Sequence, residues 1–185
     1  VIAGAIAMLS AKRVGRHPKS LLRNNGKGIF DDVTEEAGLL GFHPTQTAAW
    51  ADYDNDGRPD VFVANDTMPN FLFHNAGSFR FAETGLVSGI AVAADGKARA
   101  GMGIDTGDYD GDGRLDLVIT NLDFEMHTLH RGLERGLFGD ATTESGIGFP
   151  TLPFVGFGVA FLDFDNDAQL DIAVHPSGLR RTQRP

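Results

Sequence analysis

Short apolar runs alternate with Asp- and Gly-rich turns along most of this chain of 185 residues. Three runs, Val61 to Ala64, Leu117 to Thr120 and Ile172 to Val174, are rich in β-branched residues, and each follows a cluster of Asp residues. A Gly- and Ala-rich apolar stretch precedes each cluster. Short apolar runs bounded by turn residues are typical of strands, so the sequence predicts that each acidic cluster is a loop joining two strands.

The acidic clusters recur at a fixed spacing. Residues 52–60 read Asp-Tyr-Asp-Asn-Asp-Gly-Arg-Pro-Asp, residues 108–116 read Asp-Tyr-Asp-Gly-Asp-Gly-Arg-Leu-Asp, and residues 163–171 read Asp-Phe-Asp-Asn-Asp-Ala-Gln-Leu-Asp. A second motif, with Phe, Asp, Thr, Glu and Gly in shared positions, repeats in the same phase at residues 30–38 and 138–146, with a looser copy at 81–89. A fixed period predicts a repeat protein, here with a unit of about 55 residues.

The number of strands per repeat indicates the architecture. Segments such as Phe71 to Phe73 and Phe79 to Phe81 bring the expected count to about four, as in a propeller blade. The sequence therefore predicts an all-β fold, a partial β-propeller of about three four-stranded blades in an open arc. We expect residues 1–20 to be the truncated edge of a preceding blade. A remnant of a signal peptide is the alternative for the apolar opening of this segment. Residues 21–176 are expected to form the repeats and residues 177–185 a C-terminal tail.

The Asp spacing within each loop is typical of a calcium site. Asp at positions 1, 3 and 5 of a tight turn directs three carboxylates to one centre, and Gly at position 6 allows the sharp turn. Calcium prefers about six to eight hard oxygen ligands, so we expect calcium loops between strands, with up to three Ca²⁺ ions. The predicted ligands are the side chains at positions 1, 3, 5 and 9 and the carbonyl group at position 7. They are Asp52, Asp54, Asp56, Arg58 and Asp60; Asp108, Asp110, Asp112, Arg114 and Asp116; and Asp163, Asp165, Asp167, Gln169 and Asp171.

Two other interpretations of these loops are weaker. An EF-hand needs a bidentate Glu at position 12 between two helices, whereas these loops have Val63, Ile119 and Val174 there. Acidic turns without an ion are the simpler alternative, but four carboxylates within nine residues repel one another unless a cation lies among them. Ala168 replaces the glycine of position 6 in the third loop, so we expect the third site to bind most weakly.

Composition narrows the classes of partner. The formal net charge is −9 and no Lys/Arg cluster lies in the body of the chain, so we expect no nucleic-acid partner. The chain has no cysteine, which excludes disulfides and thiolate metal sites. The apolar opening, Val1 to Leu9, is far shorter than the ~20 residues that a membrane-spanning helix needs, so we expect no membrane span.

With these loops and their period, the region from Leu21 to Val174 resembles FG-GAP or VCBS-type repeats of integrin-α-like β-propellers. The Phe-Gly dipeptide that gives this family its name stands before the third loop as Phe157-Gly158. It is Met102-Gly103 before the second loop and is replaced by Gln46-Thr47 before the first. Residues 65–70 and 100–104 most resemble the bacterial, ASPIC/UnbV-associated, cartilage-acidic-protein-like subgroup. The resemblance implies a propeller of about seven blades with calcium loops between strands.

The expected function is a calcium-binding propeller module with a structural role or a role in protein or glycan recognition, as a fragment of a larger protein. Its partners would be a protein or glycan ligand and the remaining propeller blades. Since millimolar calcium occurs outside cells or in a periplasm, we expect an extracellular, cell-surface or periplasmic location.

The alternative function is a propeller enzyme, a polysaccharide lyase or hydrolase with its site in the central channel. It would require ionisable residues outside the loops, such as His74, Asp105, Glu125 and His127, to converge. The pair His127 and His130, with Glu125 nearby, is a further but weak candidate for a transition-metal site, because strand residues three apart point to opposite faces.

Overall fold

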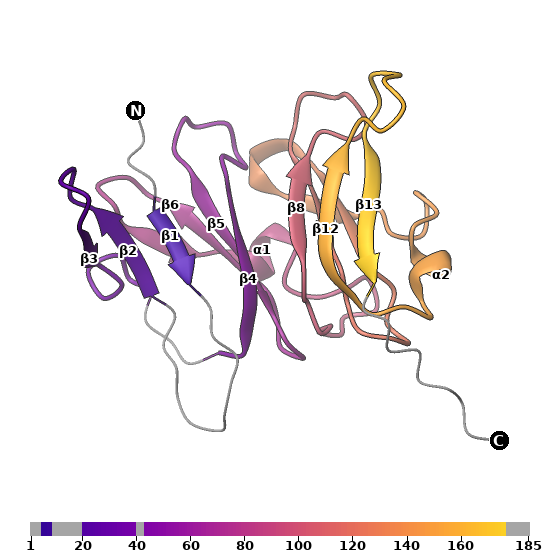
Figure 1. Ribbon diagram of the computed structural model, residues 1–185, viewed down its shortest axis with the longest axis horizontal. Coiled ribbons are helices and arrows are strands. Elements are labelled where there is room, and N and C mark those ends of the chain that lie inside the picture. Colours follow the sequence, from indigo (N-terminus) through magenta and orange to yellow (C-terminus); the bar gives the residue numbers. More distant parts are fainter. Residues whose placement is uncertain (1–4, 9–19, 40–42, 177–185) are drawn as a thin grey trace.

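The structure, a computed structural model, describes residues 5–8, 20–39 and 43–176. These residues form four antiparallel sheets that follow one another along the chain (Figure 1). The first sheet contains β1 (Ala5–Met8), β2 (Ser20–Asn24) and β3 (Phe30–Asp32). The second contains β4 (Thr45–Ala51), β5 (Asp60–Asn65), β6 (Phe71–Asn75) and β7 (Phe81–Glu83). The third contains β8 (Ile104–Gly107), β9 (Asp116–Ile119), β10 (Thr128–Gly132) and β11 (Phe138–Asp140), and the fourth contains β12 (Gly156–Leu162) and β13 (Asp171–Pro176).

The helices are short and lie in the connections between strands. They are α1 (Gly85–Ser88), α2 (Gly148–Thr151) and the single-turn 3-10 helix η1 (Glu134–Gly136). Among the described residues, no helix has the length and apolar character that crossing a membrane requires.

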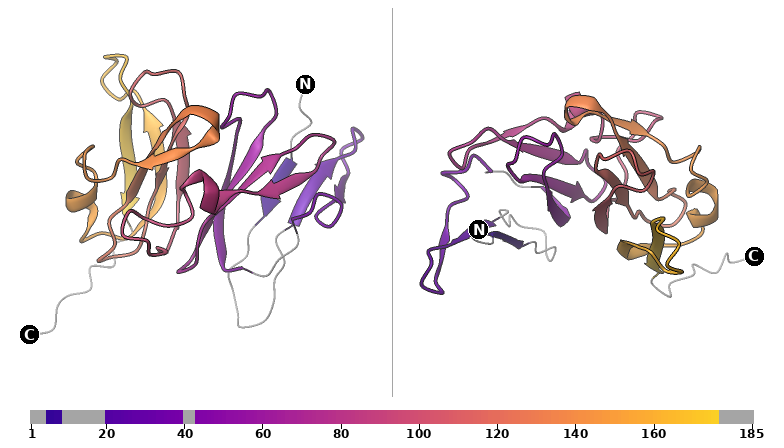
Figure 2. Two further views of the ribbon diagram at one scale, coloured as in Figure 1. Left: turned by 180° about the vertical axis from the view of Figure 1, so that it is seen from behind. Right: turned by 90° about the horizontal axis from the view of Figure 1, so that it is seen from above.

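The four sheets stand in a row and follow a curve, which gives the open arc seen from above in Figure 2. In the second and third sheets the strands are hydrogen-bonded in chain order. The first strands of neighbouring sheets contact one another, because β4 contacts β8 and β8 contacts β12. We call these the innermost strands of the stack. This confirms the all-β fold and the partial propeller predicted from the sequence. Two of the described sheets have the expected four strands, and the first and last have three and two.

The two terminal segments of the predicted domain organisation lie largely outside the described residues. The predicted tail, 177–185, lies outside the described residues, as does most of the predicted edge at 1–20. Within that edge β1 pairs with β2 in antiparallel register, Ala5 opposite Arg23 and Met8 opposite Ser20.

The core is divided into layers because the central strands are buried on both faces. All six residues of β5 are buried. Val61 and Val63 pack in one cluster with Leu21 of the first sheet, whereas Phe62 packs in a second cluster with Leu117 of the third sheet. Side chains alternate between the two faces of a strand, so one apolar run serves two cores.

Strand β9 repeats this arrangement one sheet further on. Its four residues are buried, and Leu117 and Ile119 face the second sheet. Val118 belongs to a third cluster, against which Phe161 and Ile172 of the fourth sheet pack. Burial of each such side chain stabilises the fold by roughly 1.5–3 kcal/mol, so the hydrophobic free energy resides between the sheets.

The second repeated motif forms the turn that leaves each third or fourth strand. Its acidic side chain accepts a hydrogen bond from the backbone N–H two residues later, at 2.7–3.0 Å, in all three copies. A glycine with a left-handed backbone then ends the turn. The acidic residues are Asp32, Glu83 and Asp140, and the glycines are Gly38, Gly89 and Gly146. The looser middle copy is therefore structurally equivalent to the other two.

Close approach of the third and fourth sheets explains the glycine of the Met102-Gly103 dipeptide. A Cβ atom added at Gly103 would lie 2.6 Å from the carbonyl oxygen of Phe157 in β12 and 2.8 Å from the Thr120 hydroxyl. The Gly103 N–H donates to that same hydroxyl, at 2.8 Å. Any side chain here would therefore push the third and fourth sheets apart.

We predict that Gly103→Ala destabilises the protein by about 2 kcal/mol, because backbone atoms must move to relieve the contact. Gly139→Ala is the matched control, since its added Cβ would meet nothing closer than Leu133 at 3.7 Å. Its effect should stay within about 0.5–1 kcal/mol. Denaturant unfolding of both variants measures the difference, and equal stabilities would contradict the proposed steric constraint.

Both ends of the arc expose large apolar side chains. Ile29 and Phe30 are exposed beside the first sheet. At the other end Phe157 is exposed on β12, and Phe164 is exposed in the loop that joins β12 to β13. In a stacked array such faces are normally covered by a further repeat.

We predict that the isolated 185-residue chain self-associates as its concentration rises, because contact between these ends removes apolar surface from water. Sedimentation velocity across a concentration series measures this. Replacing Phe157 and Phe164 together by Ser should weaken the association, whereas a strictly monomeric wild-type chain would contradict the prediction.

Candidate metal centres

Each acidic loop joins the innermost strand of a sheet to the next strand, and all three loops share one hydrogen-bond pattern. We number residues 52–60, 108–116 and 163–171 as positions 1 to 9. The position 1 carboxylate accepts the backbone N–H groups of positions 5 and 6, at 2.8–3.1 Å in every loop. The position 5 carboxylate accepts the N–H of position 7, at 2.8–2.9 Å. The acidic side chains thus fold the loop around themselves.

The position 9 carboxylate anchors the loop to its sheet. Asp60 accepts the N–H of position 2 at 3.1 Å and, through its other oxygen, the N–H of Asn75 in β6 at 2.7 Å. Asp116 does the same with its position 2 at 2.8 Å and with Gly132 of β10 at 2.7 Å. In the third loop Asp171 accepts the position 2 N–H at 3.0 Å.

Burial raises the pKa values of the position 9 carboxylates in the first two loops. Burial raises the pKa of Asp116 to about 6, and the nearby Asp110 and Asp112 carboxylates add to the rise, although the N–H groups of Gly132 and Tyr109 oppose it. The pKa of Asp60 is also raised, mainly by burial. Buried carboxylates beside other carboxylates favour a cation nearby, because negative charge in a poorly solvated site is costly.

Most of the carboxylates predicted as ligands converge, in groups that differ between the loops. Among the described residues, Asp112 and Asp167 at position 5 belong to no such group. Potential ligand atoms of positions 1, 3 and 9 lie within 4.8 Å of one another in the second loop and again in the third. In the first loop positions 1, 3 and 5 form one such group, and positions 3 and 9 form another with His74. These groups are all-carboxylate except for the one histidine, and hard oxygen donors at this spacing fit Ca²⁺.

Position 7 makes side-chain contacts in the first two loops that the sequence did not predict. Arg58 and Arg114 each form an ion pair with the position 5 carboxylate. Their Nε atoms also donate to the carbonyl oxygens of Asn75 and Gly132, at 2.7 and 3.1 Å. The ligand role of the position 7 carbonyl groups of Arg58, Arg114 and Gln169 stays a prediction.

Two positions of each loop have a left-handed backbone, and sequence reasoning identified only one of them. At position 6, φ is +84° for Gly57, +85° for Gly113 and +67° for Ala168. At position 4 the φ values are also positive, and the residues there are Asn55, Gly111 and Asn166. Asn and Gly tolerate this region best, so their recurrence at position 4 was the available signal.

The residues considered for an enzymatic site have separate partners. His74 lies 3.3 Å from two carboxylates of the first loop, whereas the Asp105 carboxylate accepts the N–H of Phe161 at 2.7 Å. The Glu125 carboxylate accepts the N–H of Ala100 at 2.8 Å. Within the described ranges, the clusters of His, Asp and Glu side chains that could hold a metal ion do not include Asp105, Glu125 or His127.

The His127 and His130 side chains are fully buried near β10. The Nδ1 atom of His127 accepts the backbone N–H of Asn121 at 3.1 Å. Burial lowers the pKa of both histidines to about 4. They are therefore neutral core residues at ordinary pH.

Sheets stacked in an arc, with an Asp-rich loop after each of the strands β4, β8 and β12, define a repeat of the β-propeller class. The FG-GAP-like repeat family matches residues 6–63 and 52–119, and the chain belongs to this family. The match supports the resemblance that the sequence motifs indicated.

Among known proteins the chain is similar to cartilage acidic protein 1 from several vertebrates. It is 29% identical to the Mus musculus protein over 143 residues, 28% to the Homo sapiens protein over 148, and 29% to the Xenopus tropicalis protein over 150. The alignments cover 76%, 76% and 78% of this chain but only 21%, 20% and 21% of these relatives. The chain thus spans about a fifth of their length.

We predict that Ala168→Gly raises the free energy of unfolding by about 1 kcal/mol, because a left-handed backbone costs Ala more than Gly. The reverse change in the first loop, Gly57→Ala, should lower it by a similar amount. Its added Cβ would meet no atom within 4 Å, so the change tests backbone strain without a steric clash. Chemical denaturation without added metal measures both effects, and a destabilising Ala168→Gly would contradict the strain argument.

Proposed function

We propose that this chain is a calcium-binding module of a larger β-propeller, and that the calcium ions stiffen the joint between the first two strands of successive blades. The observation that carries the proposal is the repeated geometry of the three loops. In each, the position 1 carboxylate accepts the backbone N–H of position 5, and ligand atoms of positions 1 and 3 converge with those of a third carboxylate of the loop.

The donor set supports calcium in particular. Asp54 and Asp110 at position 3 use fewer of their oxygen lone pairs on backbone N–H groups than position 1 does, which leaves oxygens free for an ion. The side chains at positions 1, 3, 5 and 9 and the position 7 carbonyl would together supply most of a calcium coordination shell. The ion would neutralise carboxylates that otherwise repel one another.

The role of the module would be structural or in recognition of a protein or glycan. Loops outside the metal turns would carry the recognition, while the remaining blades of the full-length protein would close the ring. We place this protein outside the cell, at the cell surface or in a periplasm, because modest carboxylate sites of this kind suit free calcium of about 10⁻⁴–10⁻³ M. The similarity to cartilage acidic protein 1 supports the same assignment.

The three sites would differ in strength. All three carboxylates of the third group are exposed, whereas the position 9 carboxylates of the other two loops are buried. Exposure raises the local dielectric and weakens the attraction to an ion. Together with the strained Ala168, this makes the third site the weakest.

We predict that calcium raises the melting temperature. With free calcium at about one to ten times the dissociation constant, each occupied site adds roughly 0.4–1.4 kcal/mol to the free energy of unfolding. Differential scanning calorimetry in EDTA and in excess calcium measures the shift, and isothermal titration calorimetry counts the sites.

Asp110→Asn should weaken the second site by about tenfold, because it removes one charge from the coordination shell while keeping the side-chain shape. The control is Asp31→Asn, which removes one charge from an exposed residue of β3 outside the loops. An identical melting temperature with and without calcium, together with no calcium binding by titration calorimetry, would contradict the proposal.

A further inference from the structure

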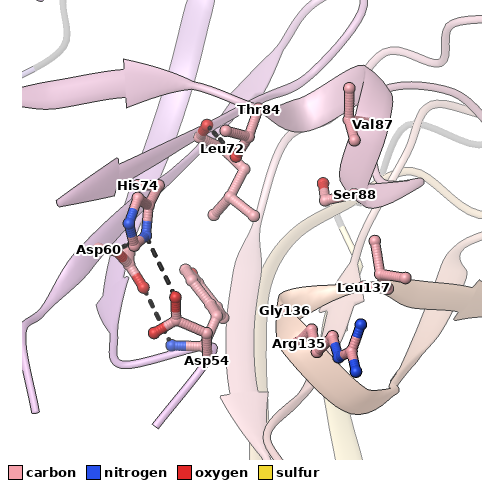
Figure 3. Close-up of a pocket in the computed structure, with 11 residues that line it drawn as sticks. Asp54, Asp60, Leu72, His74, Thr84, Val87, Ser88, Arg135, Gly136 and Leu137 are labelled. Atoms are coloured by element: carbon pink, nitrogen blue, oxygen red, sulfur yellow. Dashed lines mark hydrogen bonds and ion pairs between the residues drawn. The ribbon is translucent and has the colours of Figure 1, made fainter. Parts of the chain in front are cut away.

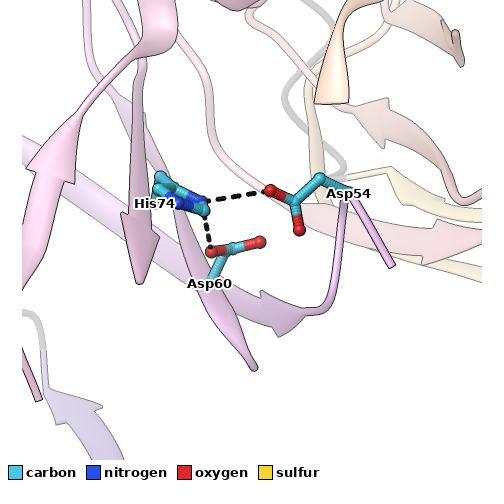
Figure 4. Close-up of side chains that lie close together, drawn as sticks. All are labelled: Asp54, Asp60 and His74. Atoms are coloured by element: carbon cyan, nitrogen blue, oxygen red, sulfur yellow. Dashed lines mark ion pairs between the residues drawn. The ribbon is translucent and has the colours of Figure 1, made fainter. Parts of the chain in front are cut away.

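The first loop differs from the other two because a histidine from another strand reaches its carboxylates. His74, on β6, places Nδ1 3.3 Å from Oδ2 of Asp54 and 3.3 Å from Oδ1 of Asp60 (Figure 4). The Asp60 side chain is 2% exposed and the His74 side chain 32% exposed. The three groups thus meet at the boundary between the core and solvent.

The separation of these atoms fits ligands that share one ion. Neighbouring ligands of a tetrahedral zinc ion, with bonds of about 2.0–2.1 Å, lie roughly 3.3–3.4 Å apart. The observed 3.3 Å distances from Nδ1 to the two carboxylates lie in this range. The ligand atoms of Asp54, Asp60 and His74 all fall within 4.8 Å of one another.

The second loop has no such nitrogen donor. The residue of β10 that corresponds to His74 is Arg131, since each immediately precedes the residue whose N–H binds the position 9 carboxylate. Arg131 instead lies 3.5 Å from Glu144. The converging group of the second loop accordingly contains carboxylates alone. A nitrogen donor is therefore a property of the first loop among these two.

A pocket beside the histidine leaves room for the rest of a coordination shell. It has a volume of about 240 Å³ and lies between the second and third sheets (Figure 3). Asp54, Asp60 and His74 line it, and Arg135 and Leu137, from the connection between β10 and β11, lie across from them. A metal ion held by three protein ligands here could complete its shell with water or with an atom of a small ligand from the pocket.

We propose that the first loop is a mixed-donor metal site, in which His74 Nδ1, Asp54 and Asp60 bind a divalent transition-metal ion of the zinc class. One imidazole and two carboxylates suit such ions, whereas calcium gains little from a nitrogen ligand. The inference rests on the proposed calcium function, because Asp54 and Asp60 belong to both ligand sets. Zinc therefore competes with calcium more strongly at the first loop than at the second.

The competing explanation of the same geometry is an ion pair between a protonated His74 and the two carboxylates. The two differ in what His74 does to metal affinity. As a ligand it increases zinc affinity and leaves calcium affinity nearly unchanged, whereas as a positive charge it opposes every cation at this loop.

The experiment uses the whole 185-residue chain and two probes, Zn²⁺ alone by isothermal titration calorimetry and Co²⁺ alone by its visible absorption. His74→Gln should weaken Zn²⁺ binding by about tenfold or more and remove the Co²⁺ absorption bands of the site. The matched control, His175→Gln, changes an exposed histidine of β13 and should leave both readings unchanged. Circular dichroism verifies that both variants fold.

Calcium titration of the same variants separates the two proposals. His74→Gln should keep every calcium site of the wild-type chain, with affinities changed by less than about threefold. Asp54→Asn should weaken both zinc and calcium at the first loop. Equal Zn²⁺ affinity in wild type and His74→Gln, or tighter binding in the variant, would overturn the mixed-donor site while leaving calcium binding intact. Zinc binding that depends on His74 in a chain that binds no calcium would overturn the proposed function instead.

Discussion

The carboxylate at position 9 is the interaction on which the local architecture of the second and third sheets depends. In the second and third sheets it begins the central strand, is fully buried, and accepts one N–H from its own loop and one from the third strand. One side chain therefore fixes the loop, the start of the central strand and the register of the strand beside it. A buried carboxylate is tolerated only when such hydrogen bonds replace its hydration, and losing one of them leaves a costly unpaired charge.

The sequence was sufficient to predict the fold because its signals are local and repeated. The three acidic loops, their spacing and the apolar runs after them indicated stacked four-stranded units, and the structure places a strand on each run. The convergence of the loop carboxylates followed from the same spacing. The repeat did not show how the carboxylates of each loop differ in role. Those at positions 1 and 5 accept backbone N–H groups, and position 1 also converges with position 3.

Other features depend on contacts between residues far apart in the sequence. The approach of His74 to the first loop depends on the pairing of β5 with β6, which places Val61 opposite Phe73. The need for glycine at position 103 arises from a carbonyl group in the next sheet. Neither can be read from a motif, because each depends on packing that forms only when neighbouring repeats stack. The left-handed backbone at position 4 was accessible in principle, since Asn and Gly recur there.

The double-sided burial of β5 and β9 has a consequence for how such a protein can grow and lose repeats. Since alternate side chains of one strand belong to two different cores, each core consists of half of one blade and half of the next. The sequence therefore repeats sheet by sheet, whereas the hydrophobic stabilisation lies in the contact between two neighbouring sheets, which we call the seam. Duplication or deletion of a whole repeat recreates a matching seam, whereas a break inside a repeat damages the seams on either side. Selection on such a chain therefore acts on complete periods of the sequence.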